Sequence, residues 1–338
     1  ESFRTLCINQ YSIDVLWSKC LMHVDKNEGL FVFLRAVAST FDNAPKFYYS
    51  HIREITDILR TSILSNSPLL RDAAARTADE LIKYYVFESD ELSIDLAPIV
   101  VNACHNHVSA DLLQVCSRIL ETTNKTDIFF DETFPFMLNL VLNNSQPDIQ
   151  DAALRCLGSL AQWSTTKINR DFKMILPMLC EILKSSADHH QYLKSPAVDF
   201  IGKLAEVVGR PLDNFLTVVN PFFIENIDND DVALALSCMN TIKLIIKSHP
   251  ETIANGIAEL VPKLQKYAST DLSQEFLKYL NLGGTDHEII TKNVLKLSGL
   301  SLQVLGAICE NMSNQNEELL IFVYKCCDLH KNSSDQFC

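Results

Sequence analysis

Two stretches of the chain, SPLLRDAAARTADEL at Ser67–Leu81 and QPDIQDAALRCLGSL at Gln146–Leu160, align without a gap at an offset of 79 residues. Pro68 and Pro147 then fall at helix starts, where a missing backbone N–H is harmless. We expect Asp72 and its counterpart Asp151 in the first turn of each helix, where a carboxylate suits the helix dipole. The paired alanines that follow indicate a close approach of two helices. The stretches therefore predict two copies of one helix, placed two repeats apart.

Four prolines give the length of that repeat. Pro135, Pro177, Pro221 and Pro262 each lie in an apolar run, and they follow one another at intervals of 42, 44 and 41 residues. Pro98 fits one repeat earlier with a shorter spacing. We expect each to lie inside the first helix of a pair, where a proline removes a hydrogen bond and bends the helix. A period of about 40 to 47 residues is typical of HEAT and armadillo arrays.

The composition agrees with long helices joined by short loops, since 47% of the residues are hydrophobic and only 9 are glycine. We predict an all-α fold, a right-handed superhelical solenoid of HEAT-type antiparallel helix pairs. Residues 1–338 should form a single array of about seven to eight pairs. Because the chain begins at Glu1 and not at Met, we expect it to be a fragment of a longer chain.

The periodicity of apolar residues gives approximate helix bounds. The expected helices are 2–22 and 28–41, the pairs 46–64 with 68–87, 91–105 with 108–123, 130–143 with 147–163, 168–185 with 193–208, 213–227 with 229–247 and 251–267 with 271–281, and two more between Asp286 and Asp328. The helix 229–247 is apolar on nearly every side. Either another segment covers it, or it is an apolar binding surface.

The net charge indicates the class of partner, and the cysteines indicate the cellular compartment. A net charge of -13 argues against direct binding of nucleic acid, which draws its affinity from clustered Lys and Arg, and favours a basic protein partner. No apolar run reaches the roughly 20 residues that span a bilayer, so no membrane insertion is expected. The cysteines lie mostly in apolar helical patterns, as in a reducing compartment. We therefore expect a cytoplasmic or nuclear location, or both.

Motifs for catalysis are missing from the sequence, which contains no phosphate loop, Gly-rich dinucleotide turn, nucleophile elbow or HExxH helix. We expect no enzyme, no cofactor and no catalytic residue. Cys104, His105 and His107 in the segment CHNH, with Cys116 beyond, are the best metal candidates. Their spacing matches no standard tetrahedral site, so the sequence favours a turn there over a metal site.

The second helix of each pair, the inner helix, should carry the recognition face on its polar stripe. The predicted partner-binding residues are Asp72, Arg76, Glu80, Lys83, Asp151, Arg155, Gln162, Trp163, Asp199, Lys203 and Glu206. A solvated face would show the same mixed charge, and Trp163 also fits a core position. A second candidate is an acidic rim at helix junctions, formed by Glu225, Asp228, Asp230 and Asp231. These carboxylates could equally cap the following helices.

One repeat carries a more specific likeness. In Lys167–Phe215, the residues Phe172, Pro177, Leu179, Ile182, Lys194, Phe200, Ile201, Ala205, Val208, Gly209 and Phe215 resemble a repeat of the importin-β (karyopherin-β) nuclear transport receptors, most closely those that import ribosomal proteins and histones. The resemblance implies a nonenzymatic solenoid that grips basic cargo, binds the GTP form of Ran GTPase and touches Phe-Gly nucleoporins. The alternative is a HEAT-repeat scaffold or regulatory subunit that assembles a multiprotein complex.

Overall fold

The computed structural model describes residues 15, 17–19, 21, 27–40, 44–84, 90–122, 127–185, 188–269, 286–311 and 317–331. Helices and the turns between them account for all of these residues, and none of them lies in a strand. The chain divides into two compact units, residues 1–167 (unit 1) and residues 168–338 (unit 2). That residues 1–338 form a single array stays a prediction.

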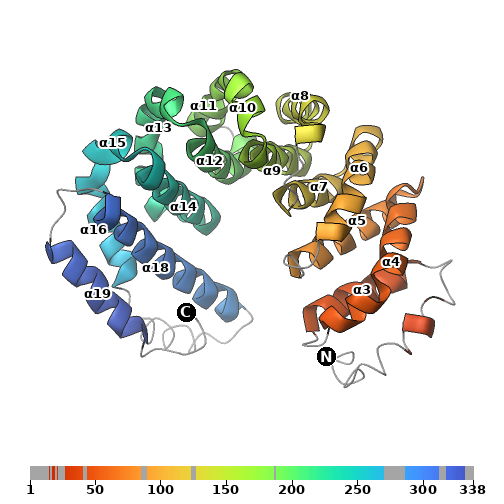
Figure 1. Ribbon diagram of the computed structural model, residues 1–338. Coiled ribbons are helices and arrows are strands. Elements are labelled where there is room, and N and C mark those ends of the chain that lie inside the picture. The colour runs from red at the N-terminus through yellow and green to blue at the C-terminus, as the bar shows by residue number, and fades with distance from the viewer. Residues whose placement is uncertain are drawn as a thin grey trace. The chain divides into compact units, whose positions relative to one another are not determined.

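In unit 1 the helices alternate between two rows (Figure 1). The inner row packs α3 on α5, α5 on α7 and α7 on α9, while α4, α6 and α8 cover these helices as the outer row. Their bounds are α3 Asn27–Thr40, α4 Ala44–Ile63, α5 Pro68–Tyr84, α6 Asp90–Asn106, α7 Ala110–Thr122, α8 Asp127–Asn143 and α9 Pro147–Trp163. Direct stacking of every second helix is the arrangement expected of a helical repeat.

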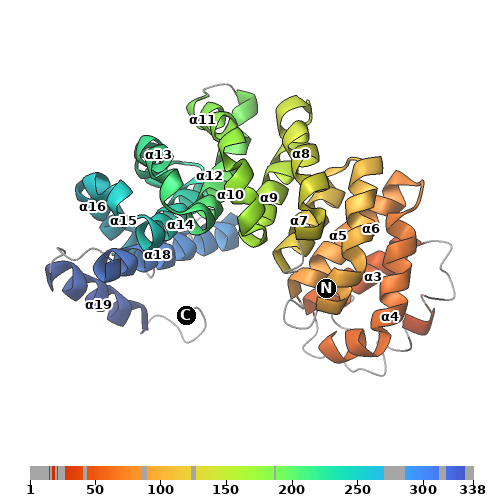
Figure 2. The ribbon, with the colours of Figure 1, turned by 45° about the horizontal axis from the view of Figure 1, so that its top comes forward.

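Unit 2 repeats this plan with α12, α14 and α18 as neighbouring inner helices (Figure 2). The outer segments are α11, α13 and α15 with α16, and α19 packs on α18. The bounds are α10 Thr165–Asp171, α11 Leu176–Lys184, α12 Asp188–Val208, α13 Asp213–Glu225, α14 Val232–Ser248, α15 Pro250–Ile253, α16 Ile257–Ala268, α18 Asp286–Asn311 and α19 Glu317–Lys331. The helix α10 begins in the last residues of unit 1.

Most of the predicted helices are confirmed within a few residues, and α9 has the predicted bounds 147–163. Two outer helices differ from prediction, because short 3-10 turns at Phe172–Met174 and Ala254–Gly256 divide them. Pro177 consequently lies in the first turn of α11 and not inside a helix. The predicted helix 271–281 and most of 2–22 lie outside the described residues.

Four other prolines lie inside helices as predicted, and one glycine follows a helix end. Pro98, Pro135, Pro221 and Pro262 lie inside α6, α8, α13 and α16. Gly209 follows the end of α12 with a φ of 69°, a left-handed conformation that favours glycine.

Most of the surface of α14 is apolar because neighbouring helices cover it. It packs against α12 on one side and α18 on the other, and also contacts α13. Cys238, Met239, Ile242, Ile245 and Ile246 are fully buried there. For these five residues the structure supports burial by other elements, whereas Leu236, Asn240 and Lys243 lie on a side of α14 that is partly exposed.

Candidate partner-binding surface

A ladder of charged side chains joins the inner helices of unit 1. Arg76 on α5 donates to Asp111 on α7 at 2.7 Å. One turn further on, Asp79 accepts hydrogen bonds from Arg118 Nε at 3.2 Å and from Gln114 Nε2 at 3.4 Å. Because Asp79 is 7% exposed, its carboxylate depends on these donors. The contacts lock α5 to α7 in one register.

The ladder continues from α7 to α9. Arg118 donates to Glu121 on its own helix at 3.3 Å, and Ser159 on α9 donates to Glu121 at 3.2 Å. The Ser117 and Ser159 hydroxyls lie 2.9 Å apart in the core. Cations and carboxylates on the inner face of unit 1 therefore neutralise one another between repeats.

The predicted residues of unit 1 are placed on this face, and several of them serve the ladder. Ser109 donates to Asp72 at 2.8 Å, and Arg76 belongs to the pair described above. Burial raises the pKa of Asp111, the partner of Arg76, while the nearby guanidinium opposes that shift.

The remaining predicted residues of unit 1 make contacts within their own helix or face solvent. Arg155 binds Asp151 at 2.9 Å, and Lys83 approaches Glu80 at 3.9 Å. Gln162 is exposed, and the side chain of Trp163 lies outside the described part of the chain. Partner binding at these positions stays a prediction.

Arg71 and Gln150 occupy equivalent positions 79 residues apart, and the side chain of each donates a hydrogen bond to a backbone carbonyl. Arg71 donates to the Ser65 carbonyl at 3.0 Å, and Gln150 donates to the Val141 carbonyl at 2.8 Å. Each side chain thus ties the start of an inner helix to backbone that precedes it. Glutamine can replace arginine here because the acceptor is a neutral carbonyl.

Hydroxyl groups and a close backbone approach join α12 to α14 in unit 2. The hydroxyls of Ser195 on α12 and Ser237 on α14 lie 2.8 Å apart, and Thr241 donates to the Val198 carbonyl at 2.9 Å. A Cβ placed on Gly202 would come within 2.8 Å of the Thr241 hydroxyl. The two helices are therefore packed at a distance that only glycine permits.

The buried His249 connects segments at the carboxyl ends of α12 and α14. Nδ1 of His249 lies 2.6 Å from a carboxylate oxygen of Asp213 on α13, and Nε2 lies 2.8 Å from the Ala205 carbonyl on α12. One imidazole thus fixes the end of α12 and the start of α13 against the residue that follows α14.

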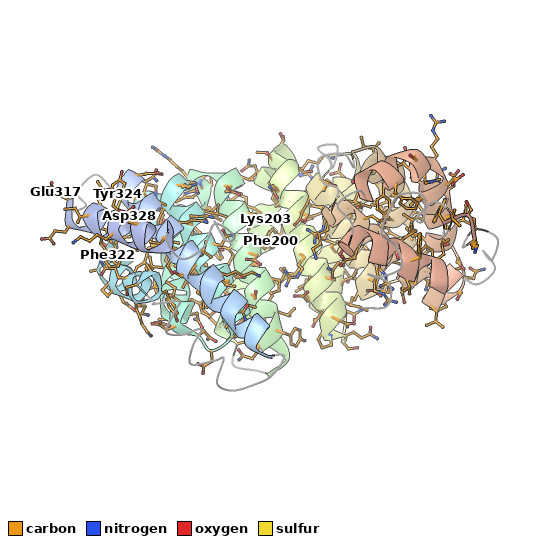
Figure 3. The ribbon with its side chains drawn as sticks, turned by 90° about the horizontal axis from the view of Figure 1, so that it is seen from below. Phe200, Lys203, Glu317, Phe322, Tyr324 and Asp328 are labelled. Atoms are coloured by element: carbon orange, nitrogen blue, oxygen red, sulfur yellow. The ribbon has the colours of Figure 1, made fainter. Side chains whose placement is uncertain are left out.

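The predicted stripe of α12 lies on the face of unit 2 that the outer helices leave uncovered. Glu206 is exposed, and Asp199 and Lys203 are partly exposed. Figure 3 labels Lys203 beside Phe200, which is 1% exposed, so one turn of α12 carries both a surface residue and a core residue. The stripe continues on α14, where Lys243 donates to Gln303 of α18 at 3.1 Å.

Sequence reasoning missed Lys243 and Gln303, along with Asp79, Arg118 and Glu121 of unit 1. The apolar character of α14 hid Lys243, although its spacing from Leu236 and Asn240 indicates one face of a helix. Asp79 could have been found, because it lies in the quoted repeat and an arginine occurs 39 residues later.

The four residues of the predicted acidic rim have different environments. Asp231 caps α14 by accepting from the backbone N–H groups of Ala233 and Leu234. Asp228 lies 3.5 Å from Lys266 on α16. Burial and the neighbouring Asp228 raise the pKa of Tyr267 to about 12. Glu225 and Asp230 are exposed, so a rim that meets a partner would rest mainly on these two side chains.

The metal candidates of the CHNH segment have separate environments. Cys104 is buried and donates to the Leu112 carbonyl at 3.5 Å, whereas the ring of His105 stacks on Phe136 with centroids 4.2 Å apart. His107 is partly exposed. Within the described residues, no three or more His, Cys, Asp or Glu side chains are placed to hold a metal ion.

Other cysteines belong to the core. Cys116 and Cys156 are buried beside Cys104, and Cys156 donates to the Leu113 carbonyl at 3.0 Å. Burial raises the pKa of Cys156 and also that of Cys238 in unit 2. These thiols behave as small apolar side chains.

No family model and no curated protein matches this sequence. Solved structures do match. The Kap95 chain of a Kap95:Nup1 complex superposes with a TM-score of 0.71 at 12% identity, covering 96% of this chain and 39% of that one. Importin beta crystallised in a polyethylene glycol condition gives 0.66 at 13% identity, over 95% of this chain and 41% of that one.

The chain has a karyopherin-like HEAT-repeat fold. The fold class predicted from the sequence, an all-α superhelical solenoid of HEAT-type helix pairs, is thereby confirmed. A third karyopherin, Kap121p bound to the SUMO protease Ulp1p, matches with a TM-score of 0.53 at 13% identity, over 90% of this chain and 31% of that one. The chain spans about two fifths of the length of the Kap95 and importin beta chains.

None of the described helices is both long enough and apolar enough to cross a bilayer.

Proposed function

We propose that this chain is a nonenzymatic protein-binding solenoid that acts as a karyopherin-like nuclear transport receptor, or as part of one, in the cytoplasm and the nucleus. The observation that carries the proposal is the likeness to Kap95 and importin beta over nearly the whole chain. The matched structures include a Kap95:Nup1 complex and Kap121p bound to the SUMO protease Ulp1p, so karyopherins of this fold bind other proteins.

The inner helices supply the surface for cargo. Their polar stripes follow one another on successive helices, which suits an extended protein segment. Basic cargo agrees with the net charge of -13 and with the exposed carboxylates Glu225 and Asp230. Each exposed carboxylate contributes little alone, so we expect affinity for cargo to come from several together.

The outer helices of unit 2 supply apolar contact points for Phe-Gly nucleoporins. Met174 is 66% exposed and Val218 on α13 is 61% exposed, and each is an apolar side chain with free surface. Small apolar contacts of this kind suit weak binding of single phenylalanine side chains.

The test is a pull-down with the intact chain immobilised. The baits are Ran loaded with GTP, Ran loaded with GDP, and a basic ribosomal-protein tail. Binding of the basic tail together with preference for the GTP form supports the proposal. Absence of both interactions refutes the transport role, and recovery of a stable enzyme complex from extract in their place favours a scaffold or regulatory subunit.

Charge-neutralising variants sharpen the test. Glu225→Gln with Asp230→Asn should weaken binding of the basic tail several-fold, because it removes two exposed carboxylates near one helix junction. Glu317→Gln with Glu318→Gln on α19 is the matched control, since it removes the same charge from exposed positions elsewhere in unit 2.

A further inference from the structure

Three lysines gather on the surface where α14 and α18 lie side by side. Lys243 and Lys247 lie one turn apart on α14, and Lys296 lies on α18. The bond from Lys243 to Gln303 shows that this face of α14 adjoins the stripe of α18 that contains Gln303. Lys296 is exposed and lies two helical turns before Gln303, on the same stripe. We call this surface the α14–α18 seam.

The positive charge of the seam is poorly neutralised. Within the described residues, Lys243, Lys247 and Lys296 make no ion pair, and α14 contains no Asp or Glu between its ends. Burial and the nearby Lys247 lower the pKa of Lys243, and Glu206 of α12 acts in the opposite direction. Among the described side chains of α18, the exposed Glu310 at the end of the helix also lies on this stripe. The chain as a whole has a net negative charge, whereas the charge of this surface is positive.

Two glycines make the seam open to another backbone. Gly299 and Gly306 flank Gln303 on α18, and a Cβ at either position would meet no atom of the described residues within 4 Å. Neither glycine is therefore explained by close packing of described residues, in contrast to Gly202. Glycine inside a helix weakens it relative to alanine. The open surface at these positions allows a peptide backbone to lie directly on α18.

The spacing of the lysines fits a short segment. Lys296 and Gln303 are about 10 Å apart along α18, and Lys247 lies about 6 Å beyond Lys243, given 1.5 Å per helical residue. The span from Lys296 to Lys247 along the seam is therefore about 16 Å, which an extended segment of about five residues covers. Partly exposed Leu236 and Leu300 border the same surface.

We propose that the α14–α18 seam binds an acidic segment of a partner protein, whose carboxylates contact Lys243, Lys247 and Lys296 while its small apolar side chains contact Leu236 and Leu300. A protein segment fits better than a nucleic acid, because Glu206, Glu310 and the net charge of the chain repel a continuous polyanion. The inference goes beyond the proposed transport role, since it names an acidic partner where the net charge suggests a basic one. It requires only that the seam be accessible.

The test is fluorescence anisotropy of the full chain with the labelled peptide EELEELEEL, at low and at high salt. We expect saturable binding that weakens as salt screens the charges. The variant Lys243→Glu with Lys247→Glu should weaken binding at least tenfold. The control Lys173→Glu with Lys184→Glu reverses the same charge on exposed positions of the outer row of unit 2 and should leave binding within twofold of the original.

A second variant guards against loss of folding. Gly299→Leu places a side chain in open space and improves helix propensity, so the chain should remain folded while the peptide is sterically excluded. Circular dichroism checks the fold of every variant. Peptide binding that is absent, or that is unchanged in both seam variants, overturns the proposal.

Two further probes test the class of partner. A single-stranded oligonucleotide of dT and vesicles with phosphatidylserine carry the same sign of charge as the peptide. If either binds the seam more tightly than EELEELEEL, the assignment to a protein partner is wrong. The basic peptide KKLKKLKKL should not compete, and its competition at the seam would also contradict the proposal. Failure of Ran or basic cargo to bind tests the transport role alone, so the two failures are distinguishable.

Discussion

The inner helices of the two units share one kind of contact, a pair of serine hydroxyls, and differ in the others. In unit 1, charged side chains such as Asp79 and Arg118 link α5 to α7, and Ser159 links α9 to Glu121 and Ser117 of α7. In unit 2, α12 and α14 are linked by hydroxyl groups and by the close approach at Gly202. Both solutions give a stacked pair of inner helices, so the repeat does not depend on one kind of contact.

The difference determines which charges remain for a partner. In unit 1 the cations Arg76, Arg118 and Arg155 are each engaged with a carboxylate of the chain. In unit 2, hydroxyl groups join α12 to α14, and α14 itself contains no Asp or Glu, so Lys243 and Lys247 face a surface with few carboxylates. Net charge alone predicts a basic partner for the whole chain. The local arrangement of charged side chains, by contrast, differs between the inner faces of the two units.

The largest expected effect concerns the close packing in unit 2. Gly202→Val should lower the free energy of unfolding by about 3 kcal/mol, because the added atoms meet Thr241 and Leu244 and overpack the contact between α12 and α14. The Thr241 hydroxyl cannot move away without losing its bond to Val198. Urea denaturation followed by circular dichroism measures the change.

The same substitution at Gly299 is the control, since that position opens into free space. Gly299→Val should change stability by less than about 0.5 kcal/mol. Equal losses at the two glycines would show that helix propensity, and not packing between helices, sets the cost.

A smaller effect is expected in the ladder of unit 1. Asp79→Ala should cost about 2 kcal/mol, because it removes the acceptor of Arg118 and Gln114 from a nearly buried site. Asp151→Ala should cost less than about 0.5 kcal/mol, since the pair with Arg155 is exposed and lies within one helix. Thermal unfolding of both variants measures the difference, and the ladder would lose its proposed role if the two were equally stable.

The smallest effect concerns the cap of α14, which stabilises the seam helix without a charge pair between helices. Asp231→Ala should cost about 1 kcal/mol, because the N–H groups of Ala233 and Leu234 lose their acceptor. The neighbouring exposed Asp230→Ala should be nearly neutral. Hydrogen exchange at the start of α14 reports the change, and protection that is unaltered in the Asp231 variant would argue against the cap.

The repeat could be predicted from the sequence because its signals are local. Apolar spacing, helix-start prolines and the 79-residue offset each depend on neighbours within one helix, and they give α9 its bounds. Pro177 is ambiguous by the same reasoning, since proline can bend a helix or begin one. The structure places it at the start of α11.

The binding surfaces could be predicted only in part. The polar stripe of one helix follows from its period, so the positions of Asp72 and Arg76 on the inner face could be predicted, and their binding of a partner stays a prediction. The pairing of Asp79 with Arg118, or of Lys243 with Gln303, depends on the register between helices 39 or 60 residues apart. Nothing in a single helix specifies that register, which arises from the packing of whole helices.

The contrast between the inner faces is tested most directly by photo-crosslinking. A copy of EELEELEEL with a photoreactive group is bound to the full chain at low salt, irradiated, and the linked residues are located by mass spectrometry. Crosslinks concentrated on α14 and α18, and lost in the variant Lys243→Glu with Lys247→Glu, are the predicted result. Crosslinks concentrated on α5, α7 and α9 would contradict the account.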